Sequence, residues 1–403
     1  MNIKQPININ SADFLRNEYA YYRWMRSDAP VSKARMGRLI NMYVLARYDD
    51  ALSMLKDKRF VRNRSTATGK ARRTPIPLPK VFSAMAKSMI IEDEPEHRRL
   101  RNLVHQAFTP RTVANLEGRI ESLAHELLDT AERQGTVDLL DAYAQPIPVT
   151  VIAEMLGIPE ADRAAFRQWT GVFTRSLSVR NMFRLYLDVR AIIGFMRDLI
   201  ARRRADPRDD LLTALIQAED EGQQLSEDEL VSMVVLLLLA GYETTINLIA
   251  NGTRTLLTHP DQLALLREQP ALIGSAVEEI LRFDSPVAST KPNYTVEEVT
   301  VSGVTIPKGA MVMPLIASAN RDERVFDNPD TFDITRTPNK HIAFGHGIHF
   351  CLGAPLARLE GKIALRTLIA RYPELRLAVE PSEIRYVDRP LMHRLRSLPV
   401  TLA

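Results

Sequence analysis

The chain has 403 residues, of which 45% are hydrophobic and 25% are charged, and its formal net charge is +4. So small a charge does not indicate nucleic-acid binding, and a single cysteine excludes a disulfide framework within the chain. The N-terminus lacks a signal peptide, and no apolar run reaches the roughly 18–20 residues of a membrane span. We therefore expect a cytoplasmic protein without a membrane anchor.

Positive charge is concentrated between residues 56 and 73, where Asp57 is the single acid. The basic residues there are Lys56, Lys58, Arg59, Arg62, Arg64, Lys70, Arg72 and Arg73. Such a stretch is usually a solvated loop. The alternative is a surface that attracts an anionic substrate or a protein partner.

Helical periodicity dominates the chain. Apolar residues recur at three- and four-residue spacing in 110–133, 184–204, 226–257 and 354–371, and Ser226 to Glu229 forms a capping-box start for the third helix. Strands are predicted at 40–46, 299–306 and 311–316, with a turn at 306–309. A length prior of about 150 residues per domain allows two or three domains, but no linker, repeat or low-complexity segment supports a division. The predicted fold class is mainly α with a small β portion.

The segment from Phe344 to Gly353 is the most informative one. It contains the only cysteine, Cys351, with histidines two and five residues before it. Ala354 and Pro355 then open a helical pattern in which the proline suits the first turn. A helix N-terminus stabilises a thiolate, and glycines let the backbone approach a flat ligand. These features favour a cysteine that ligates haem iron; the alternative is a small buried cysteine in a turn.

This segment resembles the haem-binding loop of cytochromes P450, whose pattern is Phe-x-x-Gly-x-(His/Arg)-x-Cys-x-Gly. Every fixed position matches, namely Phe344, Gly347, His349, Cys351 and Gly353. The resemblance covers nearly the whole chain. It implies a single P450 domain of residues 1–403, with haem b between the long central helix and the helix that follows the cysteine. It also implies that the Cys351 thiolate is the axial ligand of the iron.

A polar group lies in the middle of the long apolar helix, where Ala240-Gly-Tyr-Glu243-Thr244-Thr245 occurs. An acid and two threonines in an apolar helix are costly unless they have partners, so the alternative to a functional role is a helix kink with satisfied polar groups. The segment resembles the oxygen-activation motif of P450s. The resemblance implies that Thr244 hydrogen-bonds dioxygen or its water and that Glu243 relays protons to the oxygen.

Glu279 and Arg282 stand three residues apart on one predicted helix face. Such a pair is often only a surface ion pair. Here it resembles the buried Glu-x-x-Arg of P450s, a structural pair that binds this helix to the loop leading to the cysteine. The family's third member is an arginine, where this chain has Thr331 in Pro329-Asp-Thr-Phe332. Arg321, Arg324 or Arg336 are the candidates to replace it.

The resemblance also assigns residues to the haem. His97 and Arg101, four apart on a predicted helix, match the pair that holds a propionate, and His349 resembles another propionate ligand. The further propionate arginine of the family falls on Asn293, so that contact is in doubt, with Lys291 as a substitute. The remaining residues assigned to the haem are Phe344, Gly345, Gly353 and Ala240.

The substrate pocket is predicted to be apolar and adaptable, because methionine and aliphatic side chains occupy the matching segments. The alternative for any single residue is a plain core position. The predicted pocket residues are Met85, Met89, Ile90, Phe173, Leu177, Val235, Leu239, Val287, Ala288 and Met392.

The resemblance implies a monooxygenase that uses O2 to hydroxylate or epoxidise a fatty acid, terpenoid, steroid or polyketide. The chain ends soon after the cysteine helix, so electrons are expected from a separate ferredoxin or flavodoxin with an NAD(P)H-dependent reductase. A basic docking face is expected from Arg98, Arg99, Arg358, Lys362 and Arg366, with the first two facing solvent. The protein is expected to be a monomer.

Two other functions remain open at this point. A peroxide-driven peroxygenase or decarboxylase of the same fold usually has an arginine in the oxygen helix, and the acid–threonine pair at 243–244 argues against it. The basic stretch 56–73 keeps it possible, because a fatty-acid substrate is anionic. A haem-binding protein without turnover is disfavoured by the same intact pair.

Overall fold

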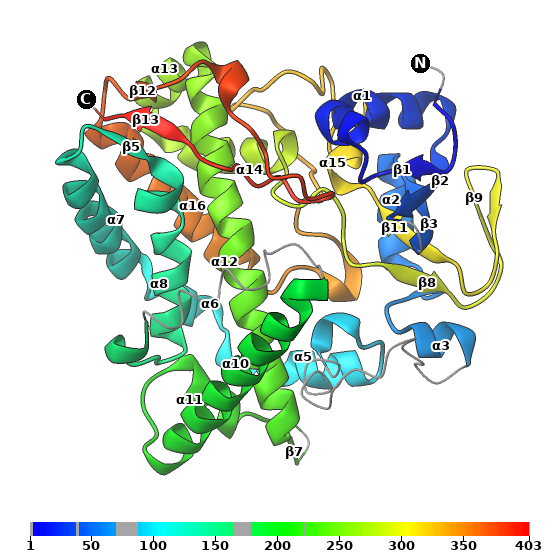
Figure 1. The fold of residues 1–403 in the computed structure, drawn as a ribbon, viewed down its shortest axis with the longest axis horizontal. Coiled ribbons are helices and arrows are strands. Elements are labelled where there is room, and N and C mark those ends of the chain that lie inside the picture. The colour runs from blue at the N-terminus through cyan, green and yellow to red at the C-terminus, as the bar shows by residue number, and fades with distance from the viewer. Residues whose placement is uncertain (1–2, 38–39, 70–87, 164–178, 221, 403) are drawn as a thin grey trace. The chain divides into compact units, whose positions relative to one another are not determined.

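Helices make up most of the protein, as the periodicity predicts (Figure 1). The computed structural model describes residues 3–37, 40–69, 88–163, 179–220 and 222–402. The chain divides into two compact units. Unit 1 comprises Met1–Arg72, Glu121–Ala144 and Thr244–Ala403, and unit 2 comprises Arg73–Ile120 and Gln145–Glu243.

The helices of unit 1 come from both halves of the chain. They are α1 (Ala12–Asp28), α2 (Tyr48–Lys56), α3 (Arg64–Thr68), α13 (Pro260–Glu268), α14 (Ile273–Phe283), α15 (Ile316–Ala319), α16 (Ala354–Arg371) and most of α7 (Glu117–Glu132). Unit 2 holds α5 (Glu96–Ala107), α6 (Pro110–Ala114), α8 (Pro146–Met155), α10 (Val179–Ala205) and α11 (Leu211–Gln217). The unit boundary falls inside α12 (Glu227–Leu257), between Glu243 and Thr244.

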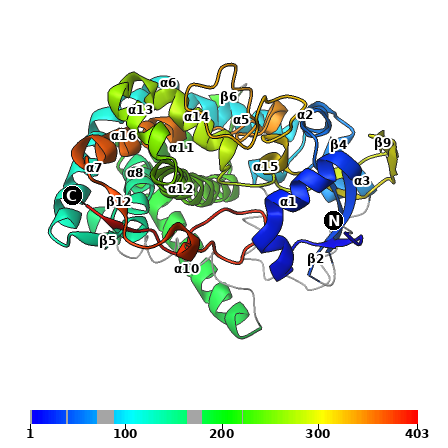
Figure 2. The same cartoon turned by 90° about the horizontal axis from the view of Figure 1, so that it is seen from above.

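The main sheet of unit 1 is mixed and has six strands in the order β1-β2-β3-β11-β8-β4. Their bounds are Ile7–Asn8, Val31–Met36, Ile40–Leu45, Met311–Pro314, Asn293–Thr295 and Phe60–Val61. Helix α1 lies beside β1 and β2 in both views (Figure 2), and Phe14, Tyr22 and Met25 of this helix share a buried cluster with sheet residues. The predicted strands at 40–46 and 311–316 are therefore confirmed.

Smaller sheets complete the β portion. Strands β5 (Thr136–Asp138), β13 (Pro399–Thr401) and β12 (Arg376–Leu377) form one, and β6 (Glu219–Asp220) pairs with β7 (Gln223–Gln224) in unit 2. The predicted single strand 299–306 is wrong. It is a hairpin of β9 (Val299–Val301) and β10 (Val304–Ile306), because Ser302 and Gly303 both have positive φ and reverse the chain.

Two of the predicted helices can be compared with the structure in detail. The capping box is confirmed, because the Ser226 backbone N–H donates to Glu229 Oε2 at 2.8 Å and the Glu229 N–H donates to Ser226 Oγ at 3.4 Å. The predicted helix 110–133 instead breaks at 115–116 into α6 and α7.

Among the described helices, α12 is the one long and apolar enough to cross a bilayer, with mean hydropathy 1.8 over its most apolar window. However, 67% of its apolar window is buried, which is also what a core helix shows.

Helices α12, α14 and α16 pack closely within unit 1. A Cβ at Gly361 of α16 would lie 2.9 Å from Leu248 of α12, and one at Gly252 would lie 3.0 Å from Ile280 of α14. Leu248, Ile280 and Leu365 belong to one buried cluster. Small residues at these two positions therefore let the helix after the cysteine approach the C-terminal part of α12.

An acid lies buried in the same packing. Glu360 of α16 is 2% exposed and forms a hydrogen bond with Thr245 of α12. Burial raises the pKa of Glu360 to about 8, although the Thr245 hydroxyl partly offsets this by favouring the carboxylate. The Glu360 side chain is therefore a protonated carboxylic acid at neutral pH.

The Glu279–Arg282 pair is fully buried. Arg282 donates to both Glu279 oxygens at 2.7 and 2.8 Å, and Arg336 donates to the same carboxylate at 3.2 Å. Arg336 thus replaces the arginine expected near Thr331, and neither Arg321 nor Arg324 does. The remaining N–H groups of both arginines bind backbone carbonyls in the segment 320–331, so that segment is held although little of it is regular.

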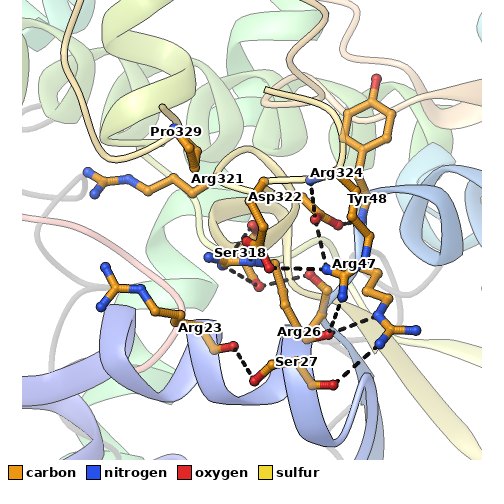
Figure 3. A network of polar contacts seen from close by, with 12 residues as sticks. Arg23, Arg26, Ser27, Arg47, Tyr48, Ser318, Arg321, Asp322, Arg324 and Pro329 are labelled. Atoms are coloured by element: carbon orange, nitrogen blue, oxygen red, sulfur yellow. Dashed lines mark hydrogen bonds and ion pairs between the residues drawn. The ribbon is translucent and has the colours of Figure 1, made fainter. Parts of the chain in front are cut away.

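A second polar network joins the same segment to the N-terminal part of the chain (Figure 3). Arg26 of α1 donates to the Ser318 carbonyl at 3.2 Å, and its own carbonyl accepts from Arg324 at 3.2 Å. Asp322 accepts from the Tyr48 backbone N–H at 2.8 Å and pairs with Arg324 at 3.1 Å. The buried side chains of Arg26 and Asp322, together with the exposed Arg324, therefore bind α1, α2 and the end of α15 to one another.

We expect Arg336→Ala to destabilise the protein by roughly 2–4 kcal/mol, because it removes one of two cations that neutralise a buried carboxylate. The unfolding midpoint in urea, followed by circular dichroism, measures this. The matched control is Arg23→Ala, which removes an exposed partner of Asp330 in the same segment and should cost under about 1 kcal/mol. Equal losses in the two variants would contradict the structural role of Arg336.

We expect Glu360→Gln to stabilise the protein in a pH-dependent way. The unfolded carboxyl ionises near 4.5 and the folded one near 8, so the native glutamate loses stability as pH rises between these values. The advantage of the glutamine variant in apparent melting temperature should therefore grow from about pH 5 to pH 8 and then level off. Glu374→Gln, at an exposed position beyond α16, controls for the substitution; an advantage that is constant with pH would refute the buried acid.

Candidate haem site

The cysteine loop lies in unit 1 between the segment held by Arg336 and helix α16. The Cys351 N–H donates to the Phe344 carbonyl at 2.9 Å, which closes the loop. Gly345 and Gly347 both have φ of +71°, and a Cβ at Gly347 would lie 2.3 Å from the Leu55 carbonyl oxygen. Glycine is therefore required at 347, because no side chain fits between the loop and the end of α2.

The loop presents its cysteine outward. Cys351 is exposed, as are Ile348 at 44% and Phe350 at 39%, whereas free cysteine is among the most often buried residue types. A thiol three residues before the first residue of α16 is also close to the positive end of the helix dipole. A soft donor beside exposed apolar side chains fits an iron porphyrin, which needs one thiolate and an apolar surface.

Arg358 of α16 lies next to this thiol. It pairs with Glu278 of α14 at 2.7 and 2.8 Å, and its guanidinium lies 4.5 Å from the centroid of the Phe344 ring. Burial alone would raise the pKa of Glu278, but hydrogen bonds from Arg358 and His341 outweigh it and lower the pKa to about 2. The hydrogen bond with Glu278 raises the pKa of Arg358 although burial opposes it, and the charge of Cys351 adds a smaller upward effect. The arginine is therefore fixed where it favours a thiolate.

The expected basic face is weaker than the sequence suggests. Arg358 is paired as described, and Arg366 pairs with Glu121 at 3.1 Å. In unit 2, Arg99 does not simply face solvent, because it pairs with Glu96 and Glu229. Arg98 is exposed, as expected, and Lys362 is half-buried.

The predicted oxygen motif lies within α12, which runs through Gly241 without interruption. A Cβ at Gly241 would meet only Ile152, at 3.8 Å, so packing does not require the glycine. Glu243 is buried, Thr244 is half-buried and Ala240 is exposed. The polar group therefore lies within a continuously assigned helix.

The predicted propionate ligands lie in separate parts of the chain. In unit 2, His97 is buried near the start of α5, and Arg101 one turn later bonds with His105 at 3.2 Å. In unit 1, His349 is half-buried in the short 3-10 turn Gly347–His349. Lys291 is exposed and Asn293 is buried in β8.

The structure brings some predicted pocket residues together. In unit 1, Val287 forms an isolated antiparallel β-bridge with Met392, and the Ala288 N–H donates to the Leu391 carbonyl at 3.0 Å. In unit 2, Met89 and Val235 are buried, whereas Ile90 and Leu239 are half-buried. Met85, Phe173 and Leu177 lie outside the described residues.

Two residues of chemical interest were missed by the sequence reasoning, Glu360 and Arg62. Glu360 follows the cysteine by nine positions in an amphipathic pattern, where an acid is usually solvated. Arg62 belongs to the basic stretch expected in solvent, yet it is buried. No local sequence signal distinguishes either from a surface charge.

Comparison with known proteins gives consistent matches. The family model described as Cytochrome P450 matches residues 165–381. The polyketide biosynthesis cytochrome P450 PksS of Bacillus subtilis is 41% identical over 97% of both chains, and its structure has a TM-score of 0.92, covering 98% of this chain and 99% of that one at 40% identity. The vitamin D(3) 25-hydroxylase of Pseudonocardia autotrophica is 44% identical over 97% of this chain and 95% of that protein.

A third relative was solved with a partner. The structure of P450BioI with an acyl carrier protein that bears hexadec-9Z-enoic acid has a TM-score of 0.88 and 37% identity, and the match covers 97% of this chain and 100% of that one. These relatives match over nearly their full lengths. The chain is therefore a member of the cytochrome P450 family, a haem-containing monooxygenase with the P450 fold.

Proposed function

We propose that this cytochrome P450 hydroxylates or epoxidises an apolar small molecule, with Cys351 as the ligand of the haem iron. The observation that carries the proposal is the cysteine loop. Its thiol is exposed ahead of α16, its glycines allow contact with α2, and Arg358 lies beside the thiol. The helix N-terminus and the arginine favour the thiolate form, and the glycines fix the loop that presents the thiol to a planar ligand.

The other predicted haem residues would bind either the propionates or the porphyrin ring of the haem. Bound haem supplies the redox-active iron at which O2 is reduced. His97, Arg101 and His349 would bind the propionates through charge-assisted hydrogen bonds. Phe344 would contact the porphyrin, and small residues at Ala240, Gly345 and Gly353 would leave room for it, so these residues position the cofactor and take no part in proton transfer.

Glu243 and Thr244 would supply the protons that oxygen reduction consumes. The threonine hydroxyl both donates and accepts, so it can hold a water or pass a proton without gaining charge. Glu243 is buried, and a carboxyl group there can take up a proton and release it.

The substrate is proposed to be apolar, and a polyketide, steroid-like molecule or fatty acid fits best. The pocket would combine Met89, Ile90, Val235 and Leu239 with Val287, Ala288 and Met392. These side chains are apolar, and methionine adapts to irregular shapes. The relatives support the same class, since their names specify polyketide biosynthesis, vitamin D(3) hydroxylation and a carrier-bound fatty acid.

Electrons are proposed to come from a separate ferredoxin or flavodoxin and its NAD(P)H-dependent reductase. Arg98 and Lys362 carry positive charge that could meet an acidic donor. We also propose that the protein is a cytoplasmic monomer and that residues 1–403 act as a single domain.

We expect Thr244→Ala to separate electron consumption from product formation. Without the hydroxyl, protons reach the oxygen less selectively, so product formation should fall about tenfold or more while NAD(P)H consumption continues and hydrogen peroxide accumulates. The measurement is product, NAD(P)H and peroxide per turnover, with a ferredoxin system and a substrate found by its spectral binding shift.

The matched control is Thr253→Ala. Thr253 is a buried threonine of the same helix, but its hydroxyl donates to the Ile249 carbonyl at 2.9 Å, so coupling should stay intact. Full coupling in Thr244→Ala would remove the proposed role of Thr244. Activity with peroxide and a fatty acid, together with no activity with any electron donor, would instead indicate a peroxygenase or decarboxylase.

A further inference from the structure

Arg62 is a buried arginine that immediately follows strand β4. Its relative exposure is 7%, although it belongs to the basic stretch expected in solvent. Its Nη1 donates to Thr290 Oγ1 at 3.4 Å and to the Lys291 carbonyl. Burial of a guanidinium is costly unless polar groups or an anion meet its charge, so this arginine is not the solvated side chain that the sequence led us to expect.

The strand register places Arg62 opposite Asn293. Strands β4 and β8 pair antiparallel, with Phe60 against Thr295 and Val61 against Tyr294, so continuing this register one residue past the end of β4 puts Arg62 opposite Asn293. Asn293 is 4% exposed, and its Oδ1 has no hydrogen-bond partner among the described residues. A neutral amide thus stands where the P450 pattern has an arginine, and an arginine stands on the neighbouring strand.

The segment 55–62 also reaches the cysteine loop. The Leu55 carbonyl is the group that a Cβ at Gly347 would strike. Burial and the charge of Lys56 lower the pKa of His346, so Lys56 also lies close to the loop. One short segment therefore connects the loop that carries His349 with the strand that carries Asn293, the two places in unit 1 where propionate contacts are expected.

We propose that Arg62 replaces the arginine absent at position 293 and binds a haem propionate from the end of β4, with the Asn293 amide as a second donor. This inference rests on the proposed haem site at Cys351. Rotation of the Asn293 side-chain amide by half a turn exchanges its oxygen and its NH2 group, so the NH2 group can then donate to a carboxylate. Lys291 is the competing cation, but its side chain is exposed, and an exposed ion pair is weak.

The test uses the holoenzyme with Arg62→Gln, which keeps hydrogen-bond donors but removes the charge. Haem transfer to excess apomyoglobin should become about tenfold faster, the size expected for one charge-assisted hydrogen bond. The reduction potential should shift to a more negative value, because a nearby cation favours the less positive ferrous haem. Arg62→Lys should restore part of both properties.

Two matched variants test which positively charged side chain acts on the haem propionate. Arg59→Gln removes an exposed arginine of the same stretch that pairs with Asp57 at 2.7 Å, and it should leave transfer rate and potential unchanged. Lys291→Gln should also have no effect. Faster transfer in Lys291→Gln, with none in Arg62→Gln, would overturn the proposal in favour of Lys291.

Reconstitution with haem dimethyl ester shows whether Arg62 acts by binding the propionate charge or by stabilising the fold. The ester has no propionate charge, so Arg62→Gln and the native protein should then lose haem at equal rates. A difference that persists with the ester would overturn the proposal and make Arg62 a structural residue.

The carbon monoxide spectrum separates this inference from the proposed haem site. A band near about 450 nm in every variant shows that thiolate ligation is intact, so equal transfer rates would then reject Arg62 alone. If the native protein lacks that band, the site at Cys351 and this inference both fail.

Discussion

The buried carboxylate of Glu279 is the constraint on which the position of the cysteine loop depends. A fully buried ionised carboxylate is tolerated only when cations neutralise it, and Arg282 and Arg336 both do so here. Their other N–H groups bind the carbonyls of an irregular segment that has little secondary structure of its own. That segment leads directly to Phe344 and Cys351. One buried charge thereby gives an irregular chain a defined path.

The adjacent acid, Glu278, extends this control to the helix after the cysteine. It binds Arg358 of α16 and His341 of the preceding segment, so α14 holds both sides of the loop. Glu360 joins the same helix to α12 at Thr245, the residue after the proposed oxygen-side threonine. A half-buried ion pair therefore fixes α16 on α14 and a buried hydrogen bond fixes it on α12, and the preorganised position of the thiol follows from them.

Most candidate site residues could be proposed from the sequence because their motifs are contiguous. The cysteine loop, the acid–threonine pair and the Glu279–Arg282 pair are each short patterns within one element, and the family and the fold are confirmed. Arg336 was one of three candidates, because 54 residues separate it from Arg282 and only the folded segment brings them together. Glu360 and Arg62 could not be recognised, since burial of a charged residue depends on neighbours far along the chain. The hairpin 299–306 was missed because Ser302 is an unusual residue for positive φ.

The most direct measurement is the carbon monoxide difference spectrum of the dithionite-reduced protein. The account predicts a band near about 450 nm, which signifies a thiolate ligand, and its loss in Cys351→Ser. Because Cys351 is the only cysteine of the chain, no other side chain could supply that signal. A band near about 420 nm in the native protein, or no haem band, would contradict ligation by the Cys351 thiolate.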